Sequence, residues 1–175
     1  MSSGIHIRQL RALTDADIDG LAAVLTDCVT GGASVSFMAP LSLERAGNYW
    51  RSLAGCVRRG ERLLLAALDE AGTIVGTVQL YLALPENQPH RADLAKMLVH
   101  RSARRRGVGA ALLEAAEAAA GAAGRTLLVL DTASSEAERL YARHGWQRLG
   151  QIPDYALYPD GRPCATTIFY KSLSP

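Results

Sequence analysis

The chain has 175 residues, of which 49% are hydrophobic and 21% charged, and this balance excludes an intrinsically disordered protein. Its 19 Lys and Arg against 17 Asp and Glu leave a net charge of +2, too small to indicate a nucleic-acid-binding protein. No apolar run reaches the roughly 18 residues that a membrane span needs, and the N-terminus lacks the apolar core of a signal peptide. We therefore expect a single domain over residues 1–175, located in the cytoplasm, with neither nucleic acid nor membrane as a partner.

The first third of the chain predicts a strand and two helices. Residues 5–10 alternate apolar and polar side chains, which is typical of a half-buried strand. Thr14 and Asp17 have the spacing of a capping box and begin a helix that stops at Gly31. A second helix is predicted over residues 42–60, with a serine cap at its start.

The remaining elements alternate strands with two further helices. In chain order we expect strands over residues 62–68, 73–84 and 93–99, a helix over about 107–123, a strand over 126–132, a helix over about 135–144, a strand in WQRLGQI, a Pro-rich loop PDYALYPDGRP and a last strand in ATTIFYKSL. This order predicts a mixed α/β fold.

The cysteines and histidines indicate neither disulfides nor a metal centre. Cys28, Cys56 and Cys164 are odd in number, far apart and without C-x-x-C spacing, so buried free thiols are expected. The four histidines have no spacing that a metal site uses, and we expect no metal.

Three arginines and two glycines stand directly before the helix over 107–123, in RRRGVG. The first turn of a helix has N–H groups without intrahelical partners and a positive dipole end, so an anion can bind there. Glycines let that anion approach the backbone, and arginines add charge. The sequence fits neither the Walker loop nor the dinucleotide G-x-G-x-x-G pattern. We expect a pyrophosphate site, with a solvated basic turn as the alternative.

Two motifs carry a resemblance to a known family. R-x-x-G-x-G, beginning at Arg104, and A-x-x-x-Y-x-x-x-G-W, beginning at Ala137, resemble the paired signatures of the GCN5-related N-acetyltransferases. The order of the elements is similar as well, over about residues 5–172. The resemblance implies a mostly antiparallel sheet flanked by helices, with two central strands that splay apart. It also implies acetyl-CoA as cosubstrate and, because dimers are common in the family, a homodimer.

The resemblance also implies which residues would bind acetyl-CoA. The backbone of residues 97–99 would pair with the pantetheine arm, with an N–H near Met97 facing the thioester oxygen. The family often has Asn where this chain has Ser134, whose shorter side chain reaches less far. The implied cofactor-binding residues are Met97, Leu98, Val99, Arg104, Arg105, Arg106, Gly107, Val108, Gly109, Ala110, Ser134, Ala137 and Tyr141.

Two carboxylates are the candidate bases for acetyl transfer. Period-two alternation predicts that Asp93, Ala95, Met97 and Val99 share one face of their strand. Asp93 would then act on the incoming amine, and Asp131 would face it across the splay. Their repulsion would raise one pKa towards the working pH. The alternatives are a solvated residue at the start of a strand for Asp93 and a helix cap for Asp131.

Tyr141 is the candidate general acid, because by family likeness its hydroxyl reaches the sulfur of CoA. The alternative is an aromatic side chain that anchors its helix. For the acceptor we expect Asp93 and Asp131, together with four residues of two loops: Ser34, Ser36, Phe37 and Tyr155. The alternative for residues 33–38 is a linker between helices with its apolar side chains packed inward.

The expected function is direct acetyl transfer from acetyl-CoA to the primary amine of a small molecule. Four stretches, GGASVSFMAPL, KMLVHRSARRRGVGAALL, LLVLDT and PDGRPCATTIFYKSL, are similar to those of a toxin-resistance acetyltransferase whose substrate is a β-lactam amino acid. An amino-acid-like toxin or antibiotic is therefore the acceptor that this likeness implies. The alternatives are acetylation of a protein or peptide, and a CoA-binding module without catalysis.

Overall fold

The computed structural model describes residues 4–173. Within these residues seven strands form one sheet in the order β1-β2-β3-β4-β5-β7-β6, and every neighbouring pair is antiparallel except β4 and β5. The strands are β1 (His6–Leu10), β2 (Arg62–Leu68), β3 (Ile74–Tyr81), β4 (Arg91–Val99), β5 (Leu127–Thr132), β6 (Gln147–Leu157) and β7 (Pro163–Ser172). The predicted mixed α/β fold with a mostly antiparallel sheet is confirmed.

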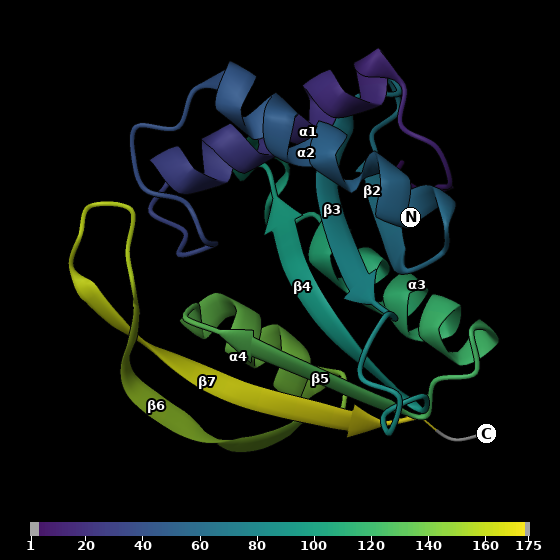
Figure 1. The fold of residues 1–175 in the computed structure, drawn as a ribbon. Helices are drawn as coiled ribbons and strands as arrows, with labels where there is room; N and C mark the ends of the chain where they lie inside the picture. The colour runs from purple at the N-terminus through teal and green to yellow at the C-terminus, as the bar shows by residue number, and fades with distance from the viewer. Residues whose placement is uncertain (1–3, 174–175) are drawn as a thin grey trace.

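Helices cover both faces of this sheet (Figure 1). They are α1 (Asp15–Thr30), α2 (Leu43–Arg58), α3 (Val108–Ala122) and α4 (Ser135–Arg143), with a short 3-10 turn at Arg101–Ala103. The core splits accordingly: α1 and α2 bury one cluster around Trp50, and α3 and α4 bury another around Leu112 and Phe169. Among the described residues, none of the helices is both long enough and apolar enough to cross a membrane.

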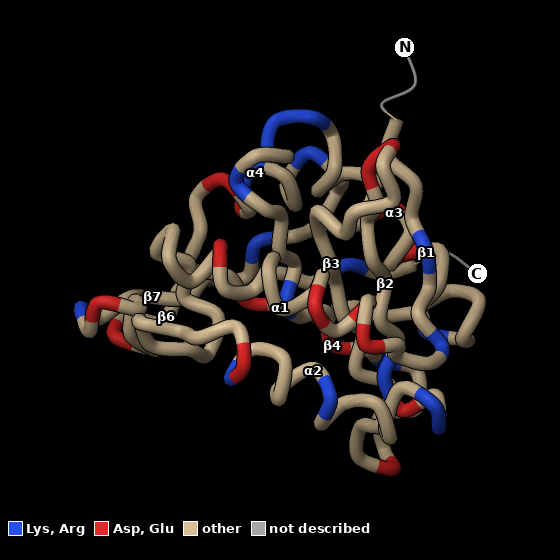
Figure 2. The backbone as a smooth tube through the Cα atoms, turned by 90° about the horizontal axis from the view of Figure 1, so that it is seen from above, with Lys and Arg blue, Asp and Glu red and all other residues tan. Residues whose placement is uncertain are grey.

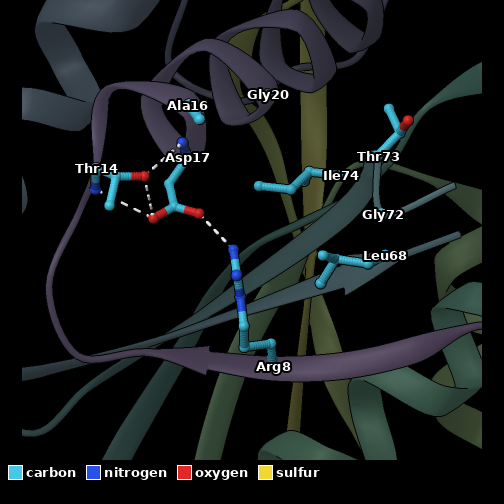
Figure 3. Close-up of a pocket in the computed structure, with 9 residues that line it drawn as sticks. All are labelled: Arg8, Thr14, Ala16, Asp17, Gly20, Leu68, Gly72, Thr73 and Ile74. Atoms are coloured by element: carbon cyan, nitrogen blue, oxygen red, sulfur yellow. Dashed lines mark hydrogen bonds and ion pairs between the residues drawn. The ribbon is translucent and has the colours of Figure 1, made fainter.

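The start of α1 is fixed by the capping box that its sequence predicts. Thr14 Oγ1 accepts a hydrogen bond from the Asp17 backbone N–H at 3.2 Å, and Asp17 Oδ2 accepts one from the Thr14 N–H at 3.1 Å. The second carboxylate oxygen of Asp17 forms an ion pair with Arg8 of β1, so the cap also holds the helix against the sheet (Figure 3). The glycine after the last turn, Gly31, ends α1 as expected.

Strands β4 and β5 run side by side only where they begin. Their parallel pairing covers Arg91–Asp93 against Leu127–Val129, after which β4 follows β3 and β5 follows β7 (Figure 1). The far part of β4, from residue 94 onward, therefore has no strand partner on its β5 side. This gap is the splay that the resemblance implies.

A bulge changes the phase of β4, and the predicted common face of Asp93, Ala95, Met97 and Val99 is wrong for this reason. Ala95 pairs with Gln79 and Leu98 with Thr77, so three steps of β4 match two steps of β3. The inserted residue is Lys96, with φ of 51°. Before it, Ala92 and Leu94 pack under α3; after it, Met97 and Val99 do so and Leu98 packs under α1.

Strand β6 is longer than predicted, because PDYAL forms strand instead of loop. Proline removes one ladder donor, but β6 is the edge of the sheet, where such a loss is tolerated. The irregularity is absorbed by a register shift between Ile152 and Ala156, with Asp154 at φ of 49°. β6 and β7 thus form a long hairpin whose tip reaches towards the loop between α1 and α2.

Candidate functional site

A cleft of about 1100 Å³ opens where β4 leaves β5. Its walls come from the loop after α1, the bulged half of β4, the start of α3, the end of β5 with α4, and the β6–β7 hairpin. Most of the predicted site residues line it together: Ser34, Ser36, Phe37, Met97, Leu98, Val99, Arg104, Arg105, Gly107, Val108, Gly109, Ala110, Asp131, Ser134, Ala137, Tyr141 and Tyr155. The remaining two predicted residues, Arg106 and Asp93, do not line this cleft.

The start of α3 has the conformation that an anion site needs. Gly107 has a φ of 81°, a left-handed conformation that strains any residue with a Cβ, and no side chain caps the helix. The first bond inside the helix runs from the Ala111 N–H to the Gly107 carbonyl at 3.0 Å. The preceding N–H groups, of residues 108–110, are therefore left for a ligand at the cleft.

The three arginines before Gly107 are exposed and differ in what they contact. The Arg104 guanidinium is turned back, and its Nε donates to the Val99 carbonyl at 3.1 Å. Arg105, at φ of 60°, lines the cleft. The run of three arginines forms the blue arc of the chain beside α4 (Figure 2). Arg105 is thus the arginine of this run best placed to add charge at the helix start.

Gly109 packs closely against α4. A Cβ at this position would lie 3.2 Å from Leu140 Cδ2, closer than side chains normally tolerate. The first turn of α3 therefore touches the helix that carries Tyr141. The two sequence motifs thus lie side by side in space, with this glycine at the point of contact.

The two candidate carboxylates sit on either side of the splay. Asp93 pairs in register with Val129, and Asp131 lies two residues further along β5, on the same face as Val129. Burial raises the pKa of Asp93 and the negative charge of Asp131 raises it further, while Arg91, whose Nη2 lies 3.3 Å from Asp93 Oδ2, opposes both. Asp93 Oδ1 is buried and has no hydrogen-bond partner within the described part of the chain.

Asp131 lines the cleft, and it is not the cap of α4. Ser134 caps that helix, with its Oγ accepting from the Ala137 N–H at 3.2 Å. Asp131 instead accepts a 2.7 Å hydrogen bond on Oδ2 from the buried Thr166 of β7. The capping alternative for Asp131 is therefore excluded, and one carboxylate is held at the cleft by a neighbouring strand.

Tyr141 anchors its helix, the alternative considered for it, and also borders the cleft. Its side chain is 3% exposed and packs against Trp146 and Phe169, with ring centroids 5.7 and 5.8 Å away, so it anchors α4. It also borders the cleft. Burial, and to a lesser extent the charge of Asp131, raises the pKa of its hydroxyl above the ordinary value of 10.0. The phenol therefore stays protonated, as a proton donor must.

Contacts between two loops join two walls of the cleft where the acceptor residues were expected. Ser34 Oγ donates to the Leu157 carbonyl at 2.8 Å, and the Ala39 N–H donates to the Pro159 carbonyl at 3.1 Å. These bonds join the loop after α1 to the β6–β7 hairpin. Phe37 packs edge-on against Tyr49 of α2 at 5.2 Å, in agreement with the inward packing considered as its alternative. Tyr155, 55% exposed, borders the cleft from β6.

Several residues of the cleft were missed by sequence reasoning. Lys96, Thr166, Cys28 and Cys164 all line it. Lys96 had no predicted role, and the bulge in β4 places it in the cleft. The sequence signal that could have drawn attention to Lys96 is the rarity of lysine, because only two of the 19 basic residues are lysines. Cys28 and Cys164 are buried free thiols, as expected, and Cys56 is partly buried.

Within residues 4–173, no three His, Cys, Asp or Glu side chains gather as a metal site would require.

Comparisons with known proteins support the fold described above. The sequence model of the acetyltransferase (GNAT) domain matches residues 59–148. A GNAT superfamily phosphinothricin acetyltransferase from Sinorhizobium meliloti, solved in complex with acetyl-CoA, is similar at a TM-score of 0.79 and 18% identity, covering 98% of this chain and 89% of that one. A ribosomal-protein-alanine N-acetyltransferase from Brucella melitensis is similar at 0.79 and 24% identity, with 96% and 99% covered. A GCN5-related N-acetyltransferase from Kribbella flavida gives 0.76 and 22% identity, with 99% and 100% covered.

Proposed function

The chain belongs to the GNAT acetyltransferase family, and from this premise we propose that it transfers the acetyl group of acetyl-CoA directly to the primary amine of a small, amino-acid-like molecule. The observation that carries the proposal is that one cleft joins the uncapped start of α3 to Asp131 and Tyr141. Residues suited to anion binding and to proton transfer thus line a single opening.

The residues present fit acetyl-CoA. The N–H groups at the start of α3 and the side chain of Arg105 would hold the pyrophosphate, because a helix start and a guanidinium both favour anions. The unpaired edge of β4 at residues 97–99 would take the pantetheine as an added strand. A structural neighbour binds the same molecule. When bound, acetyl-CoA supplies the acetyl group as a thioester.

The proton transfers would be divided between the carboxylates and Tyr141. We assign Asp131, which lines the cleft, to binding the amine, and Asp93, whose pKa is raised, to accepting a proton from it through water. Tyr141, held neutral by burial, would donate a proton to the departing sulfur. No covalent intermediate on the protein is required, so Cys28 and Cys164 need no nucleophilic role.

A small acceptor is favoured over a protein by two hydrogen bonds that tie two walls of the cleft together. The bonds from Ser34 to Leu157 and from Ala39 to Pro159 fix the loop after α1 against the β6–β7 hairpin, which would restrict the room for a peptide chain between them. The stretches GGASVSFMAPL and PDGRPCATTIFYKSL, which resemble the tabtoxin-resistance acetyltransferase, supply these loops and much of the acceptor wall. An amino-acid-like toxin or antibiotic is accordingly the acceptor we propose.

We also propose that the protein forms a homodimer through β6. This edge strand exposes Leu149, Ile152 and Leu157, which are 69%, 41% and 47% accessible. Apolar side chains on an unpaired strand edge are a liability unless another chain covers them. A second copy that pairs with β6 would cover them.

The function is tested by release of free CoA thiol from acetyl-CoA in the presence of candidate amines. The panel holds β-lactam amino acids, other amino acids, polyamines, aminoglycosides and short peptides. We expect turnover of amino-acid-like compounds, with mass spectrometry identifying an N-acetyl product. Turnover confined to peptides would favour the protein acetyltransferase alternative. Binding of CoA in calorimetry without any turnover would favour a CoA-binding module and contradict the proposal.

A further inference from the structure

Lys96 is placed in the cleft by an irregular backbone. It is the inserted residue of the β4 bulge, and its φ of 51° lies in the left-handed region, where glycine would be accommodated with less strain. A lysine that keeps such a conformation within a strand indicates that the position of its side chain matters. The bulge directs Lys96 away from the α3 core and into the lining of the cleft.

The ammonium group of Lys96 is held in place but not neutralised. Its Nζ donates to Ser36 Oγ at 3.0 Å and lies 6.0 Å from the centre of the Tyr49 ring. Within residues 4–173, no carboxylate oxygen lies within 4.0 Å of this nitrogen. A partly buried cation with hydroxyl and aromatic neighbours, and without a carboxylate in direct contact among the described residues, is suited to bind an anion.

Two charged side chains, Arg62 and Asp131, act on the Lys96 ammonium group with opposite effects. Burial lowers the Lys96 pKa, and the positive charge of Arg62 lowers it further. Arg62 is itself directed towards Gln79, whose Oε1 it contacts at 2.9 Å, and towards the ring of Tyr81. On the other side, Asp131 favours the charged form of Lys96. The acceptor end of the cleft therefore has positive charge at one wall and negative charge at the other.

We propose that Lys96 is the specificity-determining residue of the acceptor site, binding the carboxylate of the acceptor while Asp131 binds its ammonium group. The acceptor class is then a zwitterionic amino acid rather than a simple amine, a polyamine or an internal residue of a peptide. This inference rests on the proposed acetyl transfer to a small amine and names the second group that this amine must carry. Ser36 holds the lysine in position for that contact.

The test compares each amino acid with its own α-carboxamide, which keeps the amine and side chain but removes the negative charge. Proteinogenic L-amino acids and β-lactam amino acids, each with its carboxamide, are assayed as acceptors with wild-type enzyme and with Lys96→Met and Lys96→Arg. Lys171→Met is the matched control, because it alters the only other lysine, which pairs with Glu117 and His144 outside the cleft.

We expect the wild-type enzyme to prefer the free acid over the carboxamide in kcat/KM by about ten- to a hundredfold, since a charge-assisted bond is lost in the amide. Lys96→Met should abolish this preference by raising KM for the acids, with kcat/KM for the carboxamides little changed. Lys96→Arg should restore part of it, and Lys171→Met should leave it intact. An equal loss for acids and carboxamides in Lys96→Met would overturn the inference, because it would mean that the lysine only holds the loop through Ser36.

A binding measurement separates failure of this inference from failure of the proposed function. Reductive ¹³C-methylation keeps the positive charge of each lysine and gives one NMR resonance for Lys96 and one for Lys171. The Lys171→Arg variant lacks the second resonance and so identifies that of Lys96. Amino acids that shift the Lys96 resonance of the CoA-bound protein, while their carboxamides do not, support the inference even if no acetyl transfer occurs. Turnover of carboxamides or amines in preference to acids refutes it while the acetyltransferase function stands.

Discussion

The carboxylate of Asp131 raises the pKa of Asp93 across the point where β4 leaves β5. Burial has the largest effect on the Asp93 pKa, Arg91 opposes it with the next largest, and the contribution of Asp131 is the smallest of the three; the net result is a raised pKa. A carboxylate with a raised pKa is a stronger base than one with an ordinary pKa. Asp93 has such a raised pKa, and it lies on β4, the strand that borders the cleft.

Asp93→Asn is expected to change activity and stability in opposite directions. Because its folded-state pKa is raised above the ordinary value of 3.8, the Asp93 carboxyl favours the folded protein below that pH, and this contribution is lost as pH rises through the raised pKa. The free energy of unfolding of Asp93→Asn relative to wild type should therefore increase from pH 4 to pH 7, while kcat/KM falls. Urea denaturation at both pH values checks the first expectation, and a relative stability independent of pH would contradict it.

Asp131→Asn should move the acidic limb of the pH–rate profile to lower pH. Removing the negative charge of Asp131 removes one cause of the raised Asp93 pKa, so the base is deprotonated earlier on titration. KM for the amine should rise at the same time if Asp131 binds the ammonium group. The profile of kcat/KM for wild type and variant measures the shift, and an unchanged limb would exclude Asp93 as the group that titrates.

Tyr141→Phe should reduce kcat by about a hundredfold, the usual contribution of a general acid, and leave the affinity for acetyl-CoA nearly unchanged. The ring packing against Trp146 and Phe169 is retained in this variant, so thermal unfolding should change little. Since burial raises the pKa of Tyr141, wild-type activity should not decline through its ionisation below pH 10. Steady-state kinetics with calorimetry of acetyl-CoA binding test this, and normal turnover would remove Tyr141 from the mechanism.

Gly107→Ala and Gly124→Ala form a matched pair at the two ends of α3. Both glycines have a left-handed φ, 81° and 73°, and a Cβ would meet nothing within 4 Å at either. Each variant should lose about 1–2 kcal/mol of stability from backbone strain. Only Gly107→Ala should also weaken acetyl-CoA binding in calorimetry, because Gly107 stands at the cleft. Equal affinity in the two variants would argue against an anion at the start of α3.

Arg105→Gln should weaken acetyl-CoA binding and reduce its dependence on salt concentration, since one charge facing the anion is lost. Arg106→Gln is the control, because this neighbour is also exposed but lies outside the lining of the cleft. Dissociation constants at low and high salt distinguish the two variants. If both variants lose the same amount of affinity for acetyl-CoA, the arginines contribute through the overall positive charge of the loop, and a specific contact of Arg105 is contradicted.

Leu149→Lys tests the dimer. Leu149 is 69% exposed on edge strand β6, so a lysine there should leave the folded monomer intact and disfavour a second copy against the same strand. Sedimentation equilibrium should find a dimer for the wild-type protein and a larger monomer fraction for the variant. A wild-type monomer at micromolar concentration would refute the dimer.

The sequence predicted those parts of the fold that depend on local chemistry. The capping box at Thr14, the end of α1 at Gly31 and the Ser42 cap are set by neighbouring residues, and each is found as expected. The anion loop is similarly local: a glycine in left-handed conformation and an uncapped helix start follow within a few residues of each other.

What the sequence could not predict depends on partners distant along the chain. The bulge at Lys96 arises from the match between β3 and β4, and for that reason period-two counting wrongly grouped Asp93 and Ala95 with Met97 and Val99. PDYAL has turn-forming residues, yet it forms strand because β7 supplies a partner along the edge. Asp131 could be a cap or a cleft residue by sequence alone, and the bond from Thr166 decided between them.

The bonds that join the loop after α1 to the β6–β7 hairpin lie in other segments of the chain than the start of α3, although all of these segments line the same cleft. Ser34 and Leu157 belong to segments that contribute nothing to the start of α3, where the cosubstrate's anion would lie. Mutations in these two segments can therefore remodel the acceptor wall while the glycine–arginine loop is preserved. The architecture separates what must stay constant from what can diversify, so that new acceptors can evolve without rebuilding the machinery that handles the acetyl donor.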